Sequence, residues 1–198
     1  MIEYRITIDE DLDDIVAILP ENWDEITVDD YQRLFSKDFA TLPAIQQTLH
    51  IITSLTKLPE DVVLLLPIDE FKSMVEKIRF VYGEIEKVDV EYIEINDEKY
   101  YLYTDYSSLT TGEIISLDTL LESNSGNINR CLSDILCLFL RKKKDNGKLE
   151  KFSTTLFERK EMFSKLPINQ VYHLIIFFLD TKNISKVNTR DYTEENPN

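Results

Sequence analysis

The acidic residues near the start of the chain are the first candidates for chemistry. Asp9, Asp11 and Asp13 have the spacing of the first ligands of an EF-hand calcium loop. The remaining ligands are missing, because the sixth position lacks the required glycine and the twelfth, which needs a bidentate glutamate, is Pro20. We therefore expect a solvated acidic turn here and no metal site.

Histidine and cysteine offer no better candidate for catalysis. His50 and His173 each lie in an apolar helical stretch without a second histidine at ligand spacing, which predicts core or interface histidines. Cys131 and Cys137, six residues apart on an apolar helix, would point in different directions. This predicts two buried thiols in a reducing compartment and neither a disulfide nor a shared metal site.

The motifs that usually mark an enzyme are absent from the sequence. Four glycines could hardly build a phosphate-binding loop, and no GxSxG nucleophile elbow occurs. The sequence thus predicts no catalytic residue, no metal and no cofactor, and favours a protein that is not an enzyme.

Composition and charge narrow the class of partner. The 198 residues are 43% hydrophobic, enough for a real core, and the net charge of -15 would repel nucleic acids and anionic membranes. No apolar run approaches the ~18 residues of a membrane span, and the first residues do not resemble a signal peptide. We expect a soluble protein of the cytoplasm that binds other proteins.

The first half of the chain combines one strand with several helices. Alternating apolar and polar side chains predict a strand over residues 2–8. Thr27 and Asp30 resemble a capping box, which predicts a short helix through Phe35. Three prolines stand where further helices are expected to begin: Pro43, Pro59 and Pro67.

A β-hairpin is predicted over residues 86–106, with its turn at Asn96 and Asp97. It would be either an inserted arm or an addition to the edge of the first strand. Its aromatic residues either bind a partner, since tyrosine is enriched at interfaces, or pack on the helices. The candidates for protein binding are Tyr92, Tyr100, Tyr101, Tyr103 and, beyond them, Tyr106.

The second half is predicted to be helical again. A strongly apolar helix over residues 128–140 ends in a basic cluster, which either caps the negative end of the helix dipole or binds a partner. The cluster consists of Arg141, Lys142, Lys143 and Lys144. The predicted class is therefore α+β and predominantly helical, with an N-terminal strand and a hairpin between two helical halves, about 27–83 and 110–182. These would form one globular domain, 1–182, followed by a polar tail, 183–198.

The two ends of the chain differ in charge. The first thirty residues hold many carboxylates against one base, Arg5, whereas residues 141–165 are net basic. Such asymmetry could align copies head to tail in a ring, or it could have no functional meaning; the sequence leaves both readings open.

Two long stretches carry a resemblance to a known family. Residues 26–81, which contain LTKLPED, resemble the helical region of tail-assembly chaperones and related small morphogenesis proteins of tailed bacteriophages. Residues 111–123, TGEIISLDTLLES, and the later FERKEMFSKLP and IIFFL are similar to the continuation in Bacteroidota phages, including crAss-like phages. The resemblance covers about residues 26–180, interrupted by the hairpin, and includes no catalytic motif.

The resemblance implies a non-enzymatic virion or assembly protein that contacts portal, capsid or tail components near the portal or tail. One alternative is a transient chaperone that binds the tape-measure protein and leaves before maturity. Another, suggested by the acidic start, is an inhibitory or regulatory binder of a host protein. The implied location is the host cytoplasm during assembly and, for a structural component, the virion.

Overall fold

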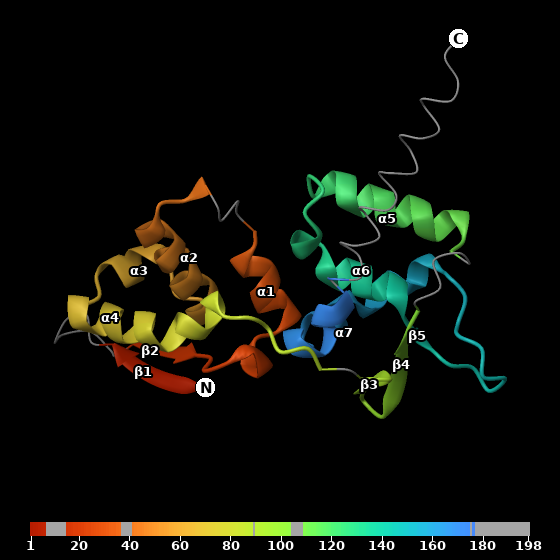
Figure 1. Ribbon diagram of the computed structural model, residues 1–198, viewed down its shortest axis with the longest axis horizontal. Helices are drawn as coiled ribbons and strands as arrows, with labels where there is room; N and C mark the ends of the chain where they lie inside the picture. The colour runs from red at the N-terminus through yellow and green to blue at the C-terminus, as the bar shows by residue number, and fades with distance from the viewer. Residues whose placement is uncertain (7–14, 37–40, 89, 104–108, 175, 177–198) are drawn as a thin grey trace, which may run out of the picture.

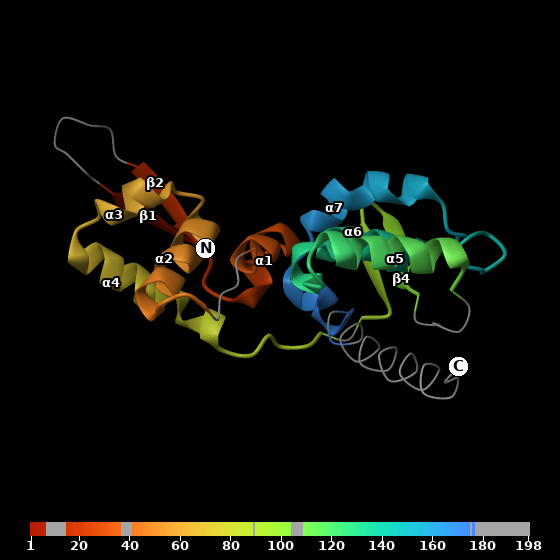
Figure 2. The same cartoon turned by 90° about the horizontal axis from the view of Figure 1, so that it is seen from above.

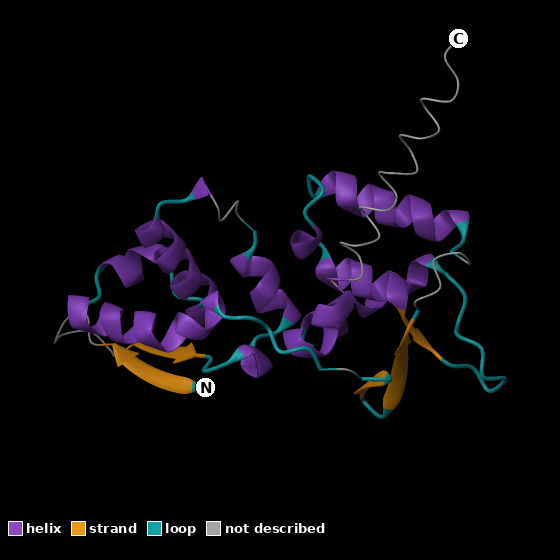
Figure 3. Cartoon of the chain, in the orientation of Figure 1, coloured by secondary structure: helices purple, strands orange, loops and turns teal. Residues whose placement is uncertain are grey.

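The structure is a computed structural model that describes residues 1–6, 15–36, 41–88, 90–103, 109–174 and 176. Most of these residues are helical, and two small antiparallel sheets complete them, so the predicted α+β class is confirmed (Figure 3). The acidic run 9–14 and the tail 183–198, for which a turn and a polar extension were predicted, lie outside the described residues.

The first sheet is a hairpin of β1 (Ile2–Ile6) and β2 (Ile15–Leu19), with Ile2 opposite Leu19. The strand predicted at the start of the chain is confirmed, but its partner β2 was not predicted. The sequence IVAIL shows no alternation, although alternate residues of β2, Ala17 and Leu19, are the buried ones. Apolar side chains on both faces of a short strand hide its period of two.

The helices of the first half begin where the sequence predicts. Thr27 Oγ1 accepts the Asp30 backbone N–H at 3.1 Å, and the Asp30 carboxylate accepts the Thr27 backbone N–H at 3.1 Å, so the capping box is present. Each of the three prolines is the N-cap of a helix. The elements are η1 (Trp23–Glu25), α1 (Val28–Leu34), α2 (Ala44–Thr56), α3 (Glu60–Leu64), α4 (Ile68–Lys77) and η3 (Ile78–Tyr82).

The second half contains the predicted hairpin and a set of mostly short helices. Asn96 and Asp97 both have positive φ, at 52° and 63°, as expected for a two-residue hairpin turn. The elements are β3 (Tyr92–Ile95), β4 (Glu98–Leu102), α5 (Thr111–Ser123), η5 (Ile128–Arg130), α6 (Leu132–Phe139), β5 (Leu140–Lys142), η6 (Thr154–Arg159) and α7 (Lys160–Ser164). Residues 168–174 are also helical.

The hairpin is neither a free arm nor an extension of the first strand, which corrects both alternatives. β4 pairs with β5 in a three-stranded sheet of order β3-β4-β5, with Tyr101 opposite Arg141. This is possible because the chain leaves α6 at Leu140 with extended backbone, φ −90° and ψ 113°. The basic cluster therefore starts on a strand, and its first residue, Arg141, still caps the helix, because its Nε donates to the Leu138 carbonyl near the end of α6 at 2.7 Å.

The elements form two lobes along the longest axis (Figures 1 and 2). The amino-terminal lobe holds β1, β2, α2, α3, α4 and η3, and the carboxy-terminal lobe holds β3, β4, β5, α5, α6, η6 and α7. Helix α1 lies between them and contacts α2 on one side and α6 and α7 on the other. One cluster of buried apolar side chains extends through both lobes.

Backbone and side-chain hydrogen bonds fasten α1 to the carboxy-terminal lobe. The Val28 N–H donates to the Leu166 carbonyl at 2.9 Å, and the Ile168 N–H donates to the Ile26 carbonyl at 2.8 Å. The Gln32 side chain donates to the Arg130 carbonyl at 2.8 Å and accepts the Ser133 N–H at 3.0 Å. The segment before α1 and the helix itself are therefore bonded to residues more than ninety positions later, while His50 of α2, with Nε2 3.0 Å from the Leu34 carbonyl, holds the end of α1 to the amino-terminal lobe.

Candidate protein-binding surfaces

Two tyrosines and two lysines form a cationic aromatic surface on one face of the second sheet. Tyr92 lies opposite Tyr101, and their ring centroids are 5.6 Å apart. Lys99 Nζ lies 4.1 Å from the centroid of Tyr92, and Lys143 Nζ lies 3.5 Å from that of Tyr101. Both rings are partly exposed and both lysines are exposed, so this lysine–tyrosine surface is accessible. Three of the predicted binding residues, Tyr92, Tyr101 and Lys143, belong to it.

Tyr100 and Tyr103 are placed differently. Tyr100 points to the opposite face, is 1% exposed and packs edge-on against Phe163 of α7 at 5.2 Å. Its hydroxyl donates to Glu98 at 3.0 Å. Tyr103 is half-buried against the core, and Tyr106 lies outside the described residues. The prediction that Tyr100 contacts a partner is wrong, because neighbouring strand residues face opposite sides and its side is covered by α7.

Arg141 is buried as well, which corrects its prediction as a binding residue. Its side chain is 1% exposed; Nη2 donates to Glu113 Oε1 at 2.8 Å and Nε to the Leu138 carbonyl at 2.7 Å. Glu113 is itself fixed at the start of α5, where it accepts the Thr110 N–H at 2.7 Å. The arginine thus joins α5 to the end of α6 inside the lobe. Sequence reasoning grouped it with the lysines because their charge is the same.

The rest of the basic cluster is divided between the sheet and a turn. Lys142 pairs with Glu98, whose pKa is held below its ordinary value first by the hydrogen bond from Lys142. The following residues turn back on themselves, since the Lys144 N–H donates to the Lys148 carbonyl at 2.9 Å. We call Lys143, Lys144 and Lys148 the lysine turn. All three are exposed, and none has a carboxylate within 4.0 Å among the described residues.

A second exposed surface lies at the junction of α3 and α4 and was not predicted. Leu64, Leu65 and Ile68 are 67%, 65% and 63% exposed. We call these three side chains the aliphatic end. Beside it, a groove of about 420 Å³ runs between α2 and α3, lined by Leu42, Ile45, Gln46, Leu49, His50, Glu60 and Leu64. The available signal was the run Leu64-Leu65-Leu66, because three consecutive leucines on one helical turn cannot all face the core.

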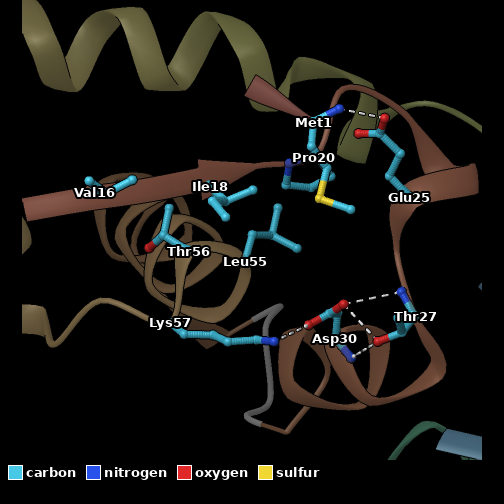
Figure 4. Close-up of a pocket in the computed structure, with 10 residues that line it drawn as sticks. All are labelled: Met1, Val16, Ile18, Pro20, Glu25, Thr27, Asp30, Leu55, Thr56 and Lys57. Carbon is cyan, nitrogen blue, oxygen red and sulfur yellow. Dashed lines mark hydrogen bonds and ion pairs between the residues drawn. The ribbon is translucent and has the colours of Figure 1, made fainter. Parts of the chain in front are cut away.

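A further groove, of about 340 Å³, separates β2 from α1 and the end of α2 (Figure 4). Its apolar wall consists of Val16, Ile18 and Leu55, of which the first two are about half exposed. The polar groups drawn along its rim already have partners: Lys57 lies 3.8 Å from Asp30, whose carboxylate accepts from Thr27, and the Thr56 hydroxyl donates to the Ile52 carbonyl at 2.7 Å. The groove therefore offers apolar contact and no free polar group among those drawn.

The histidine and cysteine residues occupy core positions. His50 is buried with Nε2 3.0 Å from the Leu34 carbonyl, and His173 is half-buried beside Tyr100. Both thiols are fully buried, as predicted. In the part of the chain that the structure describes, no three His, Cys, Asp or Glu side chains lie close enough to share a metal ion. No described helix has the length and apolar character needed to cross a membrane.

The two thiols should be inert until the protein unfolds. Burial, and then the charge of Asp134, raise the pKa of Cys137 to about 12, so its thiolate is scarce at neutral pH. We expect both thiols to react with a disulfide reagent such as DTNB roughly 100-fold more slowly in native buffer than in denaturant. The release of thionitrobenzoate measures this directly. Stoichiometric labelling of one thiol in the native protein would contradict the burial of that cysteine.

Comparison with known proteins adds no relative: no family model, no curated protein and no solved structure matches this chain. The proposal for its function therefore starts from the chemistry of two exposed regions, the aliphatic end and the lysine–tyrosine surface with its lysine turn.

Proposed function

We propose that the chain is a non-enzymatic assembly protein that works by binding other proteins, in the setting of a tailed-phage particle near its portal or tail. The observation that carries the binding role is the aliphatic end. Three large aliphatic side chains, each more than 60% exposed, lie together on one short stretch. Grouped apolar exposure of this kind marks protein interaction sites. The phage setting is supported by the resemblance of residues 26–180 alone.

The energetics of the aliphatic end favour a protein partner. Burying a leucine or isoleucine side chain fully stabilises a complex by about 1.5–3 kcal/mol relative to leaving it exposed. These three residues therefore offer a compact apolar surface whose burial would stabilise a complex. The adjoining groove between α2 and α3 could accept the apolar stripe of an amphipathic helix. A long helical client such as a tape-measure protein would present such a stripe, which keeps a transient chaperone as the second candidate.

Quantitative mass spectrometry of purified particles from the source that encodes this chain tests the proposal. A structural component should occur at a fixed ratio to the portal protein. A chaperone should occur in the lysate, bound to its client, and be missing from particles. If the chain is found in no phage context, the phage setting is wrong.

A surface variant links the result to the aliphatic end. Leu65→Asp should abolish incorporation or client binding while the protein still folds, because the residue is 65% exposed. Tyr82→Asp is the matched control, since Tyr82 is also largely exposed, at 58%, but lies outside the aliphatic end. If both variants lost incorporation or client binding equally, or if both kept it, the assignment of the binding surface to the aliphatic end would be contradicted.

A further inference from the structure

The aliphatic end is surrounded by acidic side chains. Glu60 and Asp61 open α3, Asp69 and Glu70 open α4, and all four are exposed. Among the described residues, Glu60, Asp61 and Glu70 have no cation within 4.0 Å, whereas Asp69 pairs with Lys72. The aliphatic end and these carboxylates together form an apolar surface with a negative rim.

The lysine–tyrosine surface and the lysine turn have the complementary chemistry. The partly exposed rings of Tyr92 and Tyr101 supply an apolar floor, and the lysine turn adds three lysines against one exposed carboxylate of the same turn, Asp145, which lies within 4.0 Å of none of their ammonium groups. Aliphatic side chains pack well on aromatic rings, and the carboxylates of one surface match the ammonium groups of the other. In a chain of net charge -15, such a group of unpaired lysines is a local exception.

The two surfaces lie at opposite extremes of the molecule. In Figures 1 and 2 the junction of α3 and α4 is at one end of the longest axis, and the turn that follows β5 is at the other. Helix α1 contacts both lobes and lies between them. One copy therefore cannot bring its own surfaces together, and their complementarity is available only to another molecule.

We propose that the acidic aliphatic end of one copy binds the lysine–tyrosine surface and lysine turn of the next copy, head to tail. The inference rests on the proposed function, since it makes the protein itself one of the partners in the assembly. End-to-end docking is the orientation that a strongly acidic protein should tolerate, because it brings the exceptional lysines against carboxylates and keeps the remaining like charges apart. Because the two surfaces differ, the contact is heterologous and generates a ring or a filament instead of a closed dimer.

Sedimentation velocity of the full chain, over a range of concentrations and salt, tests the contact. We expect species that grow with concentration in about 50 mM salt and dissociate in about 500 mM salt, where the Debye length falls below ~5 Å. A monomer under all these conditions would overturn the proposal. That result would not touch the proposed function, which is measured by particle composition and client binding.

Charge reversal identifies the surfaces. A tail variant, Lys143→Glu/Lys144→Glu/Lys148→Glu, and a head variant, Glu60→Lys/Asp61→Lys/Glu70→Lys, should each stay monomeric alone. Mixed in equal amounts they should associate again, because every acidic head then meets a basic tail and every basic head an acidic tail. The control Lys77→Glu/Arg79→Glu/Lys165→Glu changes the net charge as much as the tail variant does, at exposed sites elsewhere, and should associate like the original chain.

Two outcomes would reject the second copy as the occupant. Association of the original chain that survives in both reversed variants would show that the copies meet through other surfaces. A monomeric original chain, combined with loss of particle incorporation in the tail variant, would show that another acidic protein occupies the lysine turn.

Discussion

Replacing Arg141 by alanine is expected to lower the free energy of unfolding by about 3–5 kcal/mol. The side chains of Arg141 and Glu113 are 1% and 6% exposed and 2.8 Å apart. Removing the arginine leaves the Glu113 carboxylate buried without its countercharge, and it also removes the donor to the Leu138 carbonyl. Chemical denaturation followed by circular dichroism measures the change.

The neighbouring lysine supplies the control. Lys143 lies two residues after Arg141 and is exposed, so Lys143→Ala removes one positive charge from the surface. Its effect on stability should stay within about 0.5 kcal/mol. The basic cluster is thus expected to divide, with Arg141 acting on stability and Lys143 on association. Equal stability of the two alanine variants would contradict the buried role of Arg141.

A compensated variant separates the loss of the ion pair from the loss of volume. Arg141→Met combined with Glu113→Gln removes both charges and keeps similar side-chain volumes. The glutamine amide oxygen can still accept the Thr110 backbone N–H at the start of α5. Replacing a buried pair in this way is often neutral or stabilising. We therefore expect the double variant to recover most of the stability lost in Arg141→Met alone.

The features that the sequence predicted well depend on neighbours in the chain. The capping box of Thr27 and Asp30 spans four residues, and a proline fixes the backbone at the helix start where it stands. The turn at Asn96 and Asp97 needs only two residues that tolerate positive φ. In each case the interactions that select the conformation involve residues only a few positions apart in the chain.

The features that were missed depend on contacts between distant residues. Nothing local ends the helical pattern at Phe139; the extended backbone of Leu140 is stabilised by pairing with Leu102 on β4. The burial of Arg141 likewise depends on Glu113, twenty-eight residues earlier. Lys143 and Tyr101 are accessible, as the predicted binding role requires, but the sequence could not distinguish them from the buried Arg141 and Tyr100.

Replacing Trp23, the single tryptophan, by alanine is expected to destabilise the protein by about 3–5 kcal/mol. Its ring is 8% exposed and lies 6.3 Å from Tyr31 of α1 and 5.6 Å, edge-on, from Phe80 of η3. Tyr31 belongs to the helix fastened to the carboxy-terminal lobe, and Phe80 belongs to the amino-terminal lobe. Removing the indole therefore leaves a cavity between Tyr31 and Phe80 and removes an aromatic contact that joins the two lobes.

Two further variants test this role of Trp23. Trp23→Phe should cost less than the alanine variant, because it keeps an aromatic ring and removes an indole N–H that has no hydrogen-bond partner among the described residues. Tyr82→Ala, at an exposed site on the same short helix as Phe80, should change stability by no more than about 0.5 kcal/mol. Unfolding is followed by circular dichroism, since the variants at position 23 lose the fluorescent reporter.

The shape of the unfolding transition tells whether the lobes depend on each other through this ring. The original chain should unfold in one transition, because its buried apolar cluster continues through both lobes. Trp23→Ala should broaden or split that transition, since the carboxy-terminal lobe keeps its hydrogen bonds to α1 while the amino-terminal lobe loses its aromatic contact. A Trp23→Phe/Phe80→Leu double variant should then show a coupling energy of about 0.5–3 kcal/mol. Strictly additive effects, with one sharp transition in every variant, would mean that other contacts across α1 hold the lobes together.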